Sequence, residues 1–340
     1  MTQRVTMEDI ARGAGVSLAT VSLVLRHKPG INEETRRRVF NTARELGYRK
    51  HSLLTLNSSP ELQQIGLLMK LCGDSAPYAN PFYGPILASI EATCRKRQIN
   101  LLVAFMPVDI DNHPQELPRL LMDNQTDAII MAGAFVDQTI NQLLEKPGKP
   151  VVLIDAYSTD ANYDTVVSDN FRGAYHAVSH LIAAGHRHIG LVGALPDAYP
   201  SIADRRRGYE QALHDHAIAE RYFADAHLDN NDEVSVATTK LLQRFPQVTA
   251  LFCANDMAAI SALTAARALG RRLPEELSVI GFDDIETAAH VTPALTTMRV
   301  DKATMGRLAV QLLLNRVESP ESSPVTVLLR PTLVERESVR

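Results

Sequence analysis

The segment DIARGAGVSLATVSLVL, residues 9–25, contains two short apolar-periodic stretches that are separated by a glycine and a valine. Thr6 can cap a first helix, and Asp9 three residues later completes a capping box. Gly15 permits a sharp turn, because glycine adopts a positive φ without a steric cost. Ser17 can cap a second helix. The segment therefore predicts two small helices joined by a tight corner.

The second of these helices has one apolar face and one face that is free for other contacts. Spacing of i, i+3 and i+4 predicts the burial of Val21, Val24 and Leu25. The opposite face presents Ala19, Ser22, Leu23 and Arg26, with Leu18 at the tip of the helix.

A third helix is expected to begin at its cap, Asn32, and to end at Gly47. Its inward positions are Val39, Ala43 and Leu46. Three helices in this order indicate a helix-turn-helix with a supporting helix, whose second helix can enter the major groove of DNA.

The charge of the chain is divided unevenly along its length. Residues 1–50 hold ten lysines and arginines against five acidic residues, although the net charge of all 340 residues is −4. A basic head on an acidic body predicts a polyanionic partner for the head alone.

The stretches VTMEDIARGAGVSLATVSLVL and GINEETRRRVFNTARELGY, residues 5–25 and 30–48, resemble the head of the LacI/GalR family of bacterial transcriptional regulators. The resemblance implies that the tip positions that select the operator are Leu18, Ala19 and Leu23. These apolar side chains can contact thymine methyl groups. The candidate DNA contacts of the head are Thr6, Ser17, Leu18, Ala19, Thr20, Ser22, Leu23 and Arg26.

Residues 51–63 form a linker rich in Ser, Asn and Pro between the head, 1–50, and the body, 64–340. In the family that the head resembles, this hinge becomes a short helix on DNA, and a leucine wedges into the minor groove. Leu54 and Leu56 are the candidate wedges. The alternative is a flexible tether whose leucines dock on the body.

The body alternates continuous apolar runs with helical stretches. Seven such runs are expected to be strands, at 65–69, 100–104, 127–133, 150–156, 188–194, 249–256 and 277–284. This alternation predicts parallel sheets that are covered by helices on both faces, arranged as two lobes. The helical stretches are expected at 83–97, 171–184, 203–217, 256–269 and 301–316.

Ligands of open parallel sheets bind beyond the carboxyl ends of the strands, where this sequence places polar and aromatic residues. Such a set suits a ligand with many hydroxyl groups. The candidate effector contacts are Phe82, Tyr83, Asp155, Asp169, Arg205, Asn255 and Asp283. Asp and Asn at these turns are also good helix N-caps, an alternative that applies to Asp256 and to one of Asp283 and Asp284.

The resemblance extends over the body, through NPFYGPILASIE at 80–91, FCANDMAA at 252–259 and VIGFDDIETAAHVTPALTT at 279–297. It implies two periplasmic-binding-protein-like lobes, and effector contacts at Arg205, Asn255 and Asp283. The first lobe is expected near 64–166 and 295–324, and the second near 167–294 and 325–340.

These patterns predict a dimeric, DNA-binding transcriptional repressor that is controlled by a small polar effector, a sugar or a sugar derivative, between the lobes. Two heads on adjacent half-sites of double-stranded operator DNA would supply the affinity. The alternatives are a solute-binding protein without a transcriptional role and a regulator controlled by a protein partner.

Other features narrow the class of protein. We expect no enzyme, because no nucleophile motif or phosphate loop accompanies the aspartates, and no cofactor. Cys72, Cys94 and Cys253 are expected to be buried thiols without metal spacing, and His186 and His188 lack further metal ligands. Without an apolar signal segment or a run of 18 apolar residues, we expect a cytoplasmic protein that is not bound to a membrane.

Overall fold

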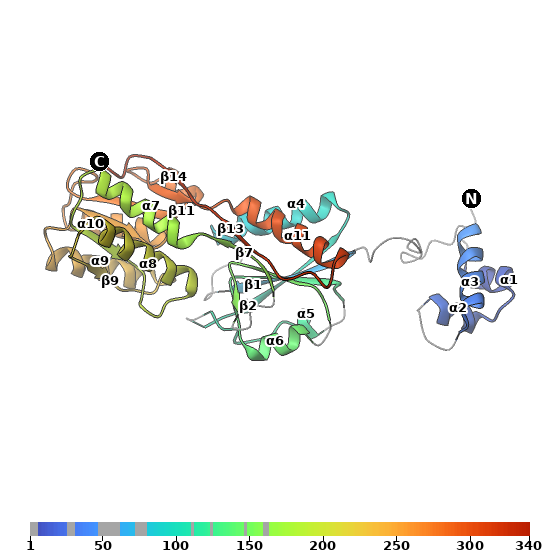
Figure 1. Cartoon of the computed structure of the whole chain (residues 1–340). Coiled ribbons are helices and arrows are strands. Elements are labelled where there is room, and N and C mark those ends of the chain that lie inside the picture. The colour runs from blue at the N-terminus through green and yellow to red at the C-terminus, as the bar shows by residue number, and fades with distance from the viewer. Residues whose placement is uncertain are drawn as a thin grey trace. The chain divides into compact units, whose positions relative to one another are not determined.

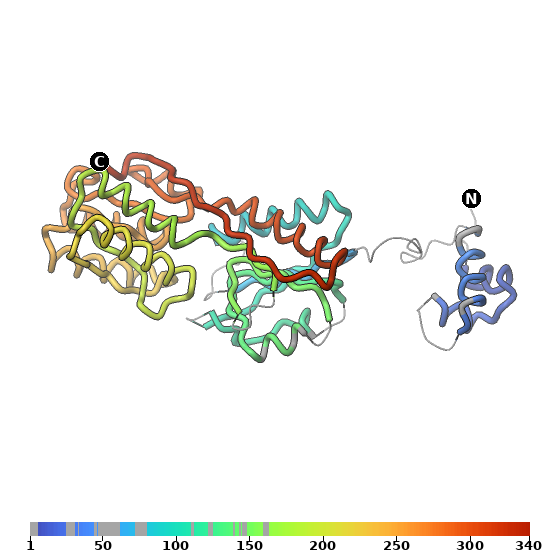
Figure 2. The backbone as a smooth tube through the Cα atoms, viewed as in Figure 1, coloured from blue at the N-terminus to red at the C-terminus, as the bar shows by residue number. Residues whose placement is uncertain are grey.

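The computed structural model describes residues 6–25, 31–46, 62–71, 80–109, 112–122, 125–145, 148–158 and 163–340. The chain forms two compact units, Met1–Glu61 and Leu62–Arg340. We refer to them as the head and the body, and Figures 1 and 2 trace both. Among the described helices, none has both the length and the apolar character needed to cross a bilayer.

The head is built from three helices, α1 (Met7–Ala14), α2 (Leu18–Leu25) and α3 (Glu33–Glu45). Thr6 and Asp9 form the expected capping box, and Gly15 ends α1 with a φ of 64°. Ser17 Oγ accepts a hydrogen bond of 3.0 Å from the amide of Thr20, and Asn32 Oδ1 accepts one of 2.8 Å from the amide of Thr35. The predicted caps of all three helices are therefore confirmed.

The core of the head joins one face of each helix. Its buried members are Ile10, Ala14, Val21, Val24, Val39, Phe40 and Ala43. The expected burial of Leu46 is wrong, since this side chain is 41% exposed where α3 has already ended. Phe40 is buried in the core instead, because it is larger and lies within the helix. Gly47 lies outside the described residues.

The first lobe of the body contains a six-stranded, all-parallel sheet in the order β13-β7-β5-β3-β1-β2. A short two-stranded sheet pairs β4 (Phe135–Val136) with β6 (Tyr157–Ser158). The large sheet and its helices comprise β1 (Gln64–Leu71), α4 (Tyr83–Lys96), β2 (Asn100–Pro107), α5 (Arg119–Met122), β3 (Ala128–Ala132), α6 (Gln138–Glu145), β5 (Val151–Ile154), β7 (Asp164–Ser168), α11 (Lys302–Glu318) and β13 (Thr326–Leu329).

The second lobe contains a six-stranded sheet in the order β14-β12-β11-β10-β8-β9, in which only the pairing of β14 with β12 is antiparallel among the described strands. Its elements are α7 (Asn170–Ala183), β8 (Ile189–Val192), α8 (Pro200–Asp215), β9 (Tyr222–Ala224), α9 (Asn231–Arg244), β10 (Ala250–Cys253), α10 (Asp256–Ala268), β11 (Ser278–Asp283), the 3-10 helix η2 (Glu286–Ala289), β12 (Thr296–Arg299) and β14 (Thr332–Val334).

The chain passes between the lobes after β7, after β12 and after β13. The expected lobe boundaries are therefore wrong at two places. Residues 296–299 pair with β11 in the second lobe, and residues 326–329 pair with β7 in the first. Both strands are only four residues long. Their lobe is determined by the strand with which each one pairs, and that partner is distant in the sequence.

Helices cover both faces of each sheet, as the continuous apolar strands predict. Helices α4 and α11 pack together on one face of the first lobe, and α7 and α8 pack together in the second. Cys94 and Cys253 are buried free thiols, and burial raises the pKa of Cys94 to about 11. Cys72 lies outside the described residues.

Candidate functional site

Helix α2 presents an exposed apolar surface. Leu18 is 44% exposed and Leu23 is 41% exposed, and Ala19 beside them is also exposed. Val21 and Val24 on the opposite face are buried in the core. The residues expected to reach base edges therefore face outward on one helix that the core holds firmly.

The hydroxyl groups of the predicted DNA contacts also form hydrogen bonds within the head. Ser17 and Thr20 are joined by a hydrogen bond of 2.8 Å between their hydroxyl oxygens, while Ser22 is half-buried. Thr6, at the start of α1, is exposed and donates a hydrogen bond from its hydroxyl to Asp9. Of the other predicted DNA contacts, Arg26, Leu54 and Leu56 lie outside the described residues.

The body contains a cavity of about 600 Å³ whose walls come from both lobes. Of the seven expected effector residues, six line it: Phe82, Tyr83, Asp155, Arg205, Asn255 and Asp283. Asp155 follows β5, Asn255 follows β10 and Asp283 ends β11, so the carboxyl ends of strands from both sheets meet here.

Arg205 is 4% exposed, and three hydrogen bonds and one stacking contact hold its guanidinium group. Its Nε donates to Asn170 Oδ1 over 3.0 Å, its Nη1 donates to the carbonyl oxygen of Ala254 over 2.5 Å, and its Nη2 lies 3.1 Å from Asp283 Oδ1. The group also stacks 3.8 Å from the ring centre of Phe282. These contacts fix the orientation of the planar guanidinium group on the second-lobe side of the cavity.

Asp155 forms the matching carboxylate of the first-lobe wall. It is buried, and the hydroxyl of Tyr83 donates a hydrogen bond of 2.7 Å to its Oδ2. Burial raises the pKa of Asp155, although the hydrogen bond from Tyr83 and the charges of Lys70 and Arg205 act against that rise. Burial likewise raises the pKa of Asp283 to about 6, against the opposing charges of Arg205 and Lys302.

Asp169 does not lie among the cavity-lining residues, contrary to the expectation from the sequence. Its Oδ1 accepts a hydrogen bond of 3.1 Å from the amide of Arg172 and so caps helix α7. The next residue, Asn170, accepts the hydrogen bond from Arg205 instead. Asp169 as an effector contact therefore stays a prediction, and its neighbour Asn170 is the residue of this turn that contacts Arg205.

Two other aspartates at strand ends are structural. Asp256 accepts hydrogen bonds of 2.5 Å from the Thr297 hydroxyl and 2.8 Å from the amide of Ile285. Asp284 pairs with Arg299 and Arg336, each over 2.6 Å. Asn255 has a structural role and also lines the cavity. Its side chain caps α10 by accepting a hydrogen bond from the amide of Ala258.

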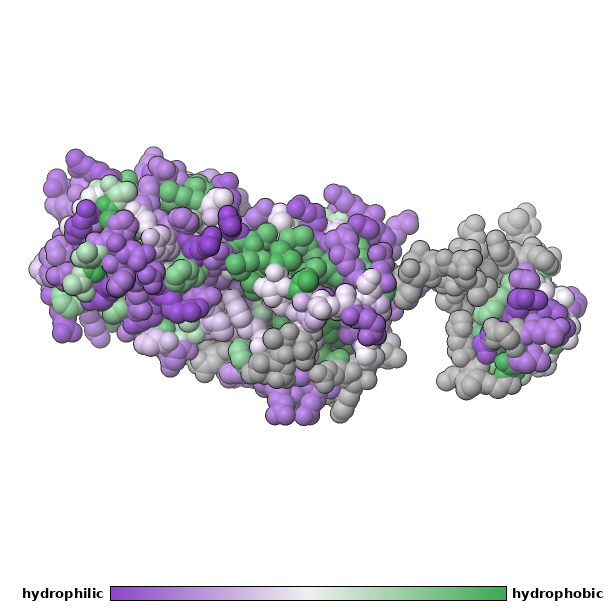
Figure 3. Space-filling model, in the orientation of Figure 1, coloured by the Kyte–Doolittle hydropathy of each residue, from purple (hydrophilic) through white to green (hydrophobic). Residues whose placement is uncertain are grey.

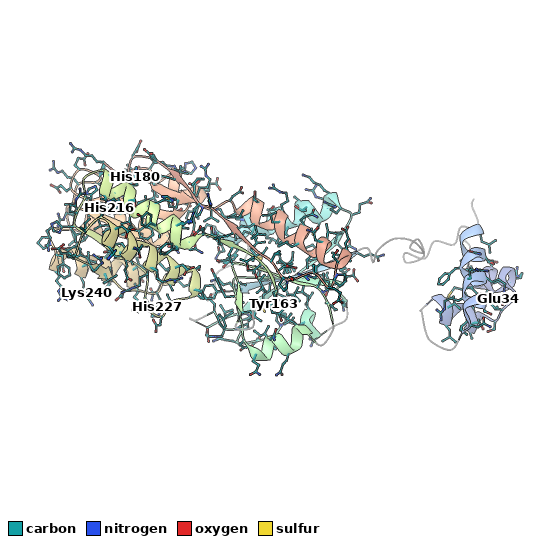
Figure 4. The ribbon with its side chains drawn as sticks, in the orientation of Figure 1. Glu34, Tyr163, His180, His216, His227 and Lys240 are labelled. Carbon is teal, nitrogen blue, oxygen red and sulfur yellow. The ribbon has the colours of Figure 1, made fainter. Side chains whose placement is uncertain are left out.

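Several cavity residues were missed at the sequence level, among them Lys70, Asn112, Tyr199 and His227. Lys70 Nζ donates a hydrogen bond of 2.6 Å to Asn112 Oδ1 and lies 5.5 Å from the ring centre of Tyr83. The position of Lys70 at the carboxyl end of β1 was the available signal. His227, labelled in Figure 4, lies beside Glu233 with 3.0 Å between Nδ1 and Oε1.

His186 and His188, which precede β8, both lie beside hydrogen-bonding side chains. His186 lies within hydrogen-bond distance of Thr249 and Ser278, and His188 Nδ1 lies 3.0 Å from the Tyr222 hydroxyl. Over the described residues, no group of three or more metal-ligating side chains occurs.

Two family models match the chain. Residues 6–51 match the model for bacterial regulatory proteins of the lacI family, and residues 178–339 match the model for a periplasmic binding protein-like domain. The chain is 34% identical to the ribose operon repressor of Haemophilus influenzae over 337 residues, which cover 98% of each protein.

Solved structures agree with these matches. A complex of the transcriptional regulator CelR with cellobiose has 28% identity and a TM-score of 0.71, and the match covers 98% of this chain and 100% of the other. A LacI family transcriptional regulator from Enterococcus faecium with bound ribose has 26% identity and a TM-score of 0.70, with coverage of 82% and 98%. Proteins of this family regulate transcription and are generally not enzymes.

Proposed function

Since this chain belongs to the LacI family of bacterial regulatory proteins, we propose that it is a dimeric transcriptional repressor whose affinity for operator DNA is set by a sugar bound between the lobes. The observation that carries this proposal is the cavity whose walls come from both lobes. A ligand in this cavity contacts both lobes at once, so it stabilises one arrangement of the lobes relative to another.

The head supplies the DNA contacts in this proposal. Leu18, Ala19 and Leu23 face outward on α2 and reach base edges, where apolar side chains contact thymine methyl groups. Exposed basic side chains such as Arg12, Arg37 and Arg38 contact phosphates and fix the register of the helix. Leu54 and Leu56 remain the proposed minor-groove wedges.

Dimerisation through the body brings two heads to adjacent half-sites. Figure 3 shows an apolar patch on the visible face of the first lobe. A groove on the body is lined partly by the half-buried side chains of Leu87, Leu101 and Val103, the last two on edge strand β2. Apolar surface of this kind suits burial against a second copy of the chain.

The polar groups of the cavity suit a ligand with several hydroxyl groups. Carboxylates accept hydrogen bonds from hydroxyls, guanidinium and ammonium groups donate to them, and Phe82 and Tyr83 offer ring faces to C–H groups. Structures of relatives hold cellobiose and ribose, and a similar chain is a ribose operon repressor. These names support a sugar effector here.

The alternatives are less well supported. A solute-binding protein has no use for a basic head that matches a DNA-binding family. An enzyme needs a positioned acid, base or nucleophile, whereas Asp155 and Asp283 are occupied by Tyr83 and Arg205. A protein partner in place of the sugar would leave a cavity of 600 Å³ between the lobes without a role. We place the repressor in the cytoplasm, where its DNA is found.

Binding of the full-length protein to DNA from upstream of its own gene tests the proposal. Fluorescence anisotropy at several salt concentrations should give a specific complex that weakens steeply as salt rises, because phosphate contacts release counterions. A scrambled duplex of the same length is the control and should bind about a thousandfold more weakly. Equal affinity for the two duplexes would contradict the proposal.

A further inference from the structure

The cavity is lined by a lysine, Lys70, to which the proposed function assigns no role. Lys70 lies near the carboxyl end of β1, is half-buried, and lines the cavity from the first lobe. Its ammonium group donates to Asn112, which is itself buried. Among the described residues, Asn112 accepts a hydrogen bond from this ammonium group, which carries three N–H donors and lines the cavity.

Aromatic rings from both lobes fix the position of this ammonium group. Its nitrogen lies 5.5 Å from the ring centre of Tyr83 and 5.6 Å from that of Tyr199. Tyr83 belongs to α4 in the first lobe, and Tyr199 precedes α8 in the second. The two cation–π contacts and the hydrogen bond to Asn112 hold Lys70 at the cavity wall instead of letting it extend to bulk water.

The charges around Lys70 oppose an anionic ligand. Of the described residues that line the cavity, the cations are Lys70 and Arg205, and the carboxylates are Asp155, Asp197, Asp229 and Asp283. Arg205 is already paired with Asp283 at 3.1 Å, and the charge of Lys70 acts on Asp155.

We infer that Lys70 is a specificity-determining residue that donates hydrogen bonds to an uncharged sugar, and that the acidic lining of the cavity rejects phosphorylated or carboxylated forms of the same sugar. The inference rests on the proposed function, because it assigns the chemical class of the effector in the same cavity. A phosphate group would meet carboxylates on both walls and a guanidinium that Asp283 already neutralises.

Isothermal titration calorimetry of the full-length wild-type protein tests the ligand class with matched pairs. The pairs are D-ribose with D-ribose 5-phosphate, D-glucose with D-glucose 6-phosphate, and cellobiose with its 6-phosphate. We expect one neutral sugar to bind and its phosphate ester to bind at least about a hundredfold more weakly, as expected for like charges placed together. An ester that binds as tightly as its neutral partner would overturn the inference.

Lys70→Met tests the residue, because methionine keeps the unbranched side chain and removes the charge. We expect the affinity for the neutral sugar to fall about tenfold or more, the loss typical of one hydrogen bond from a charged donor. Lys240→Met is the matched control, since Lys240 is exposed on α9 and does not line the cavity, and its affinity should stay within about twofold of wild type. Figure 4 labels this control residue.

The outcomes separate this inference from the proposed function. Unchanged sugar affinity in Lys70→Met, with the melting temperature of wild type, would show that Lys70 does not select the ligand. A loss confined to a phosphate ester would make Lys70 an anion receptor, again contrary to the inference. Failure of every sugar to bind the wild-type protein would contradict the proposal that the effector is a sugar. The proposal that the protein binds operator DNA is tested separately by the anisotropy measurement.

Discussion

The hydroxyl of Tyr199 lies 3.1 Å from the carbonyl oxygen of Asp155 and so connects the two lobes through the wall of the cavity. The same hydroxyl lies 3.1 Å from the carbonyl oxygen of Ala134, so its single proton is shared between two acceptors of the first lobe. Tyr157 packs edge-on against the Tyr199 ring at 5.2 Å between centres. A side chain of the second lobe thus closes onto the first.

Tyr199→Phe should weaken ligand binding a fewfold, because it removes a hydrogen bond between the lobes, worth about 0.5–1.5 kcal/mol, and keeps the ring packing. Calorimetry with the cognate sugar measures the change. Tyr175→Phe is the control, because Tyr175 lies on α7 and is not among the residues that line the cavity. Equal ligand affinity in Tyr199→Phe and wild type would show that this contact does not favour the closed arrangement.

Arg205→Ala should abolish the response to ligand and leave DNA binding without ligand intact. The variant loses the donors that face the cavity and leaves Asp283 buried without its partner, a change that costs about 3–5 kcal/mol of stability at most. Loss of the positive charge also raises the pKa of Asp283 further above its present value of about 6, so protonation of that carboxyl limits the cost.

Its neighbour Arg207 provides the control, because it is exposed and pairs with Asp204 on the surface. Arg207→Ala should change the unfolding free energy by less than about 0.5 kcal/mol and leave ligand binding as it is. Thermal unfolding and calorimetry measure both variants. Ligand affinity that survives in Arg205→Ala would remove Arg205 from the site.

Asp256 should make the body less stable as the pH rises. Burial and the nearby charge of Asp283 raise its pKa from 3.8 to about 7, so the folded state holds a proton that the unfolded state releases. This contribution to stability is complete below pH of about 4 and is lost as the pH rises through about 7.

Asp256→Asn removes that titration and can keep both hydrogen bonds, since the Thr297 hydroxyl can accept from the amide. The melting temperature of the variant should therefore rise relative to wild type between pH 5 and pH 8. Differential scanning calorimetry at the two pH values gives this difference. The same difference at both pH values would mean that Asp256 does not titrate in this range.

Leu18→Ala should change which DNA sequence is preferred. The loss of apolar contact with a thymine methyl group should reduce discrimination at one base pair by about 1 kcal/mol and leave the dependence on salt unchanged. Binding to a set of single-base-pair operator variants measures the effect. Leu46→Ala, which alters a leucine of similar exposure away from α2, should leave the preference intact. A uniform loss over all sequences would argue against base contact by Leu18.

The parts of the molecule that were predictable from sequence are those that local chemistry determines. Thr6, Gly15, Ser17 and Asn32 act on backbone groups within three or four residues of themselves, so their roles follow from spacing alone. The continuous apolar strands of the body were found for the same reason, because burial on both faces leaves a direct signal in the sequence.

Features that depend on distant partners were missed or misplaced. Lys70 becomes a cavity residue only because Tyr199, 129 positions away in the chain, closes over it from the other lobe. Asp169 and Asn170 are both polar residues at one turn, and only the position of Arg205 decides which of them that arginine contacts. Strands β12 and β13 were assigned to the wrong lobes because the sheet that a short strand joins is determined by pairing.

The most direct test of the central claim is the reciprocity between the two binding sites. The dissociation constant for operator DNA is measured with and without saturating sugar, and that for the sugar with and without saturating DNA. The account predicts the same ratio from both, about 5-fold to 150-fold, since coupling free energy is shared by the two ligands. A ratio of one, with both ligands bound, would contradict the account.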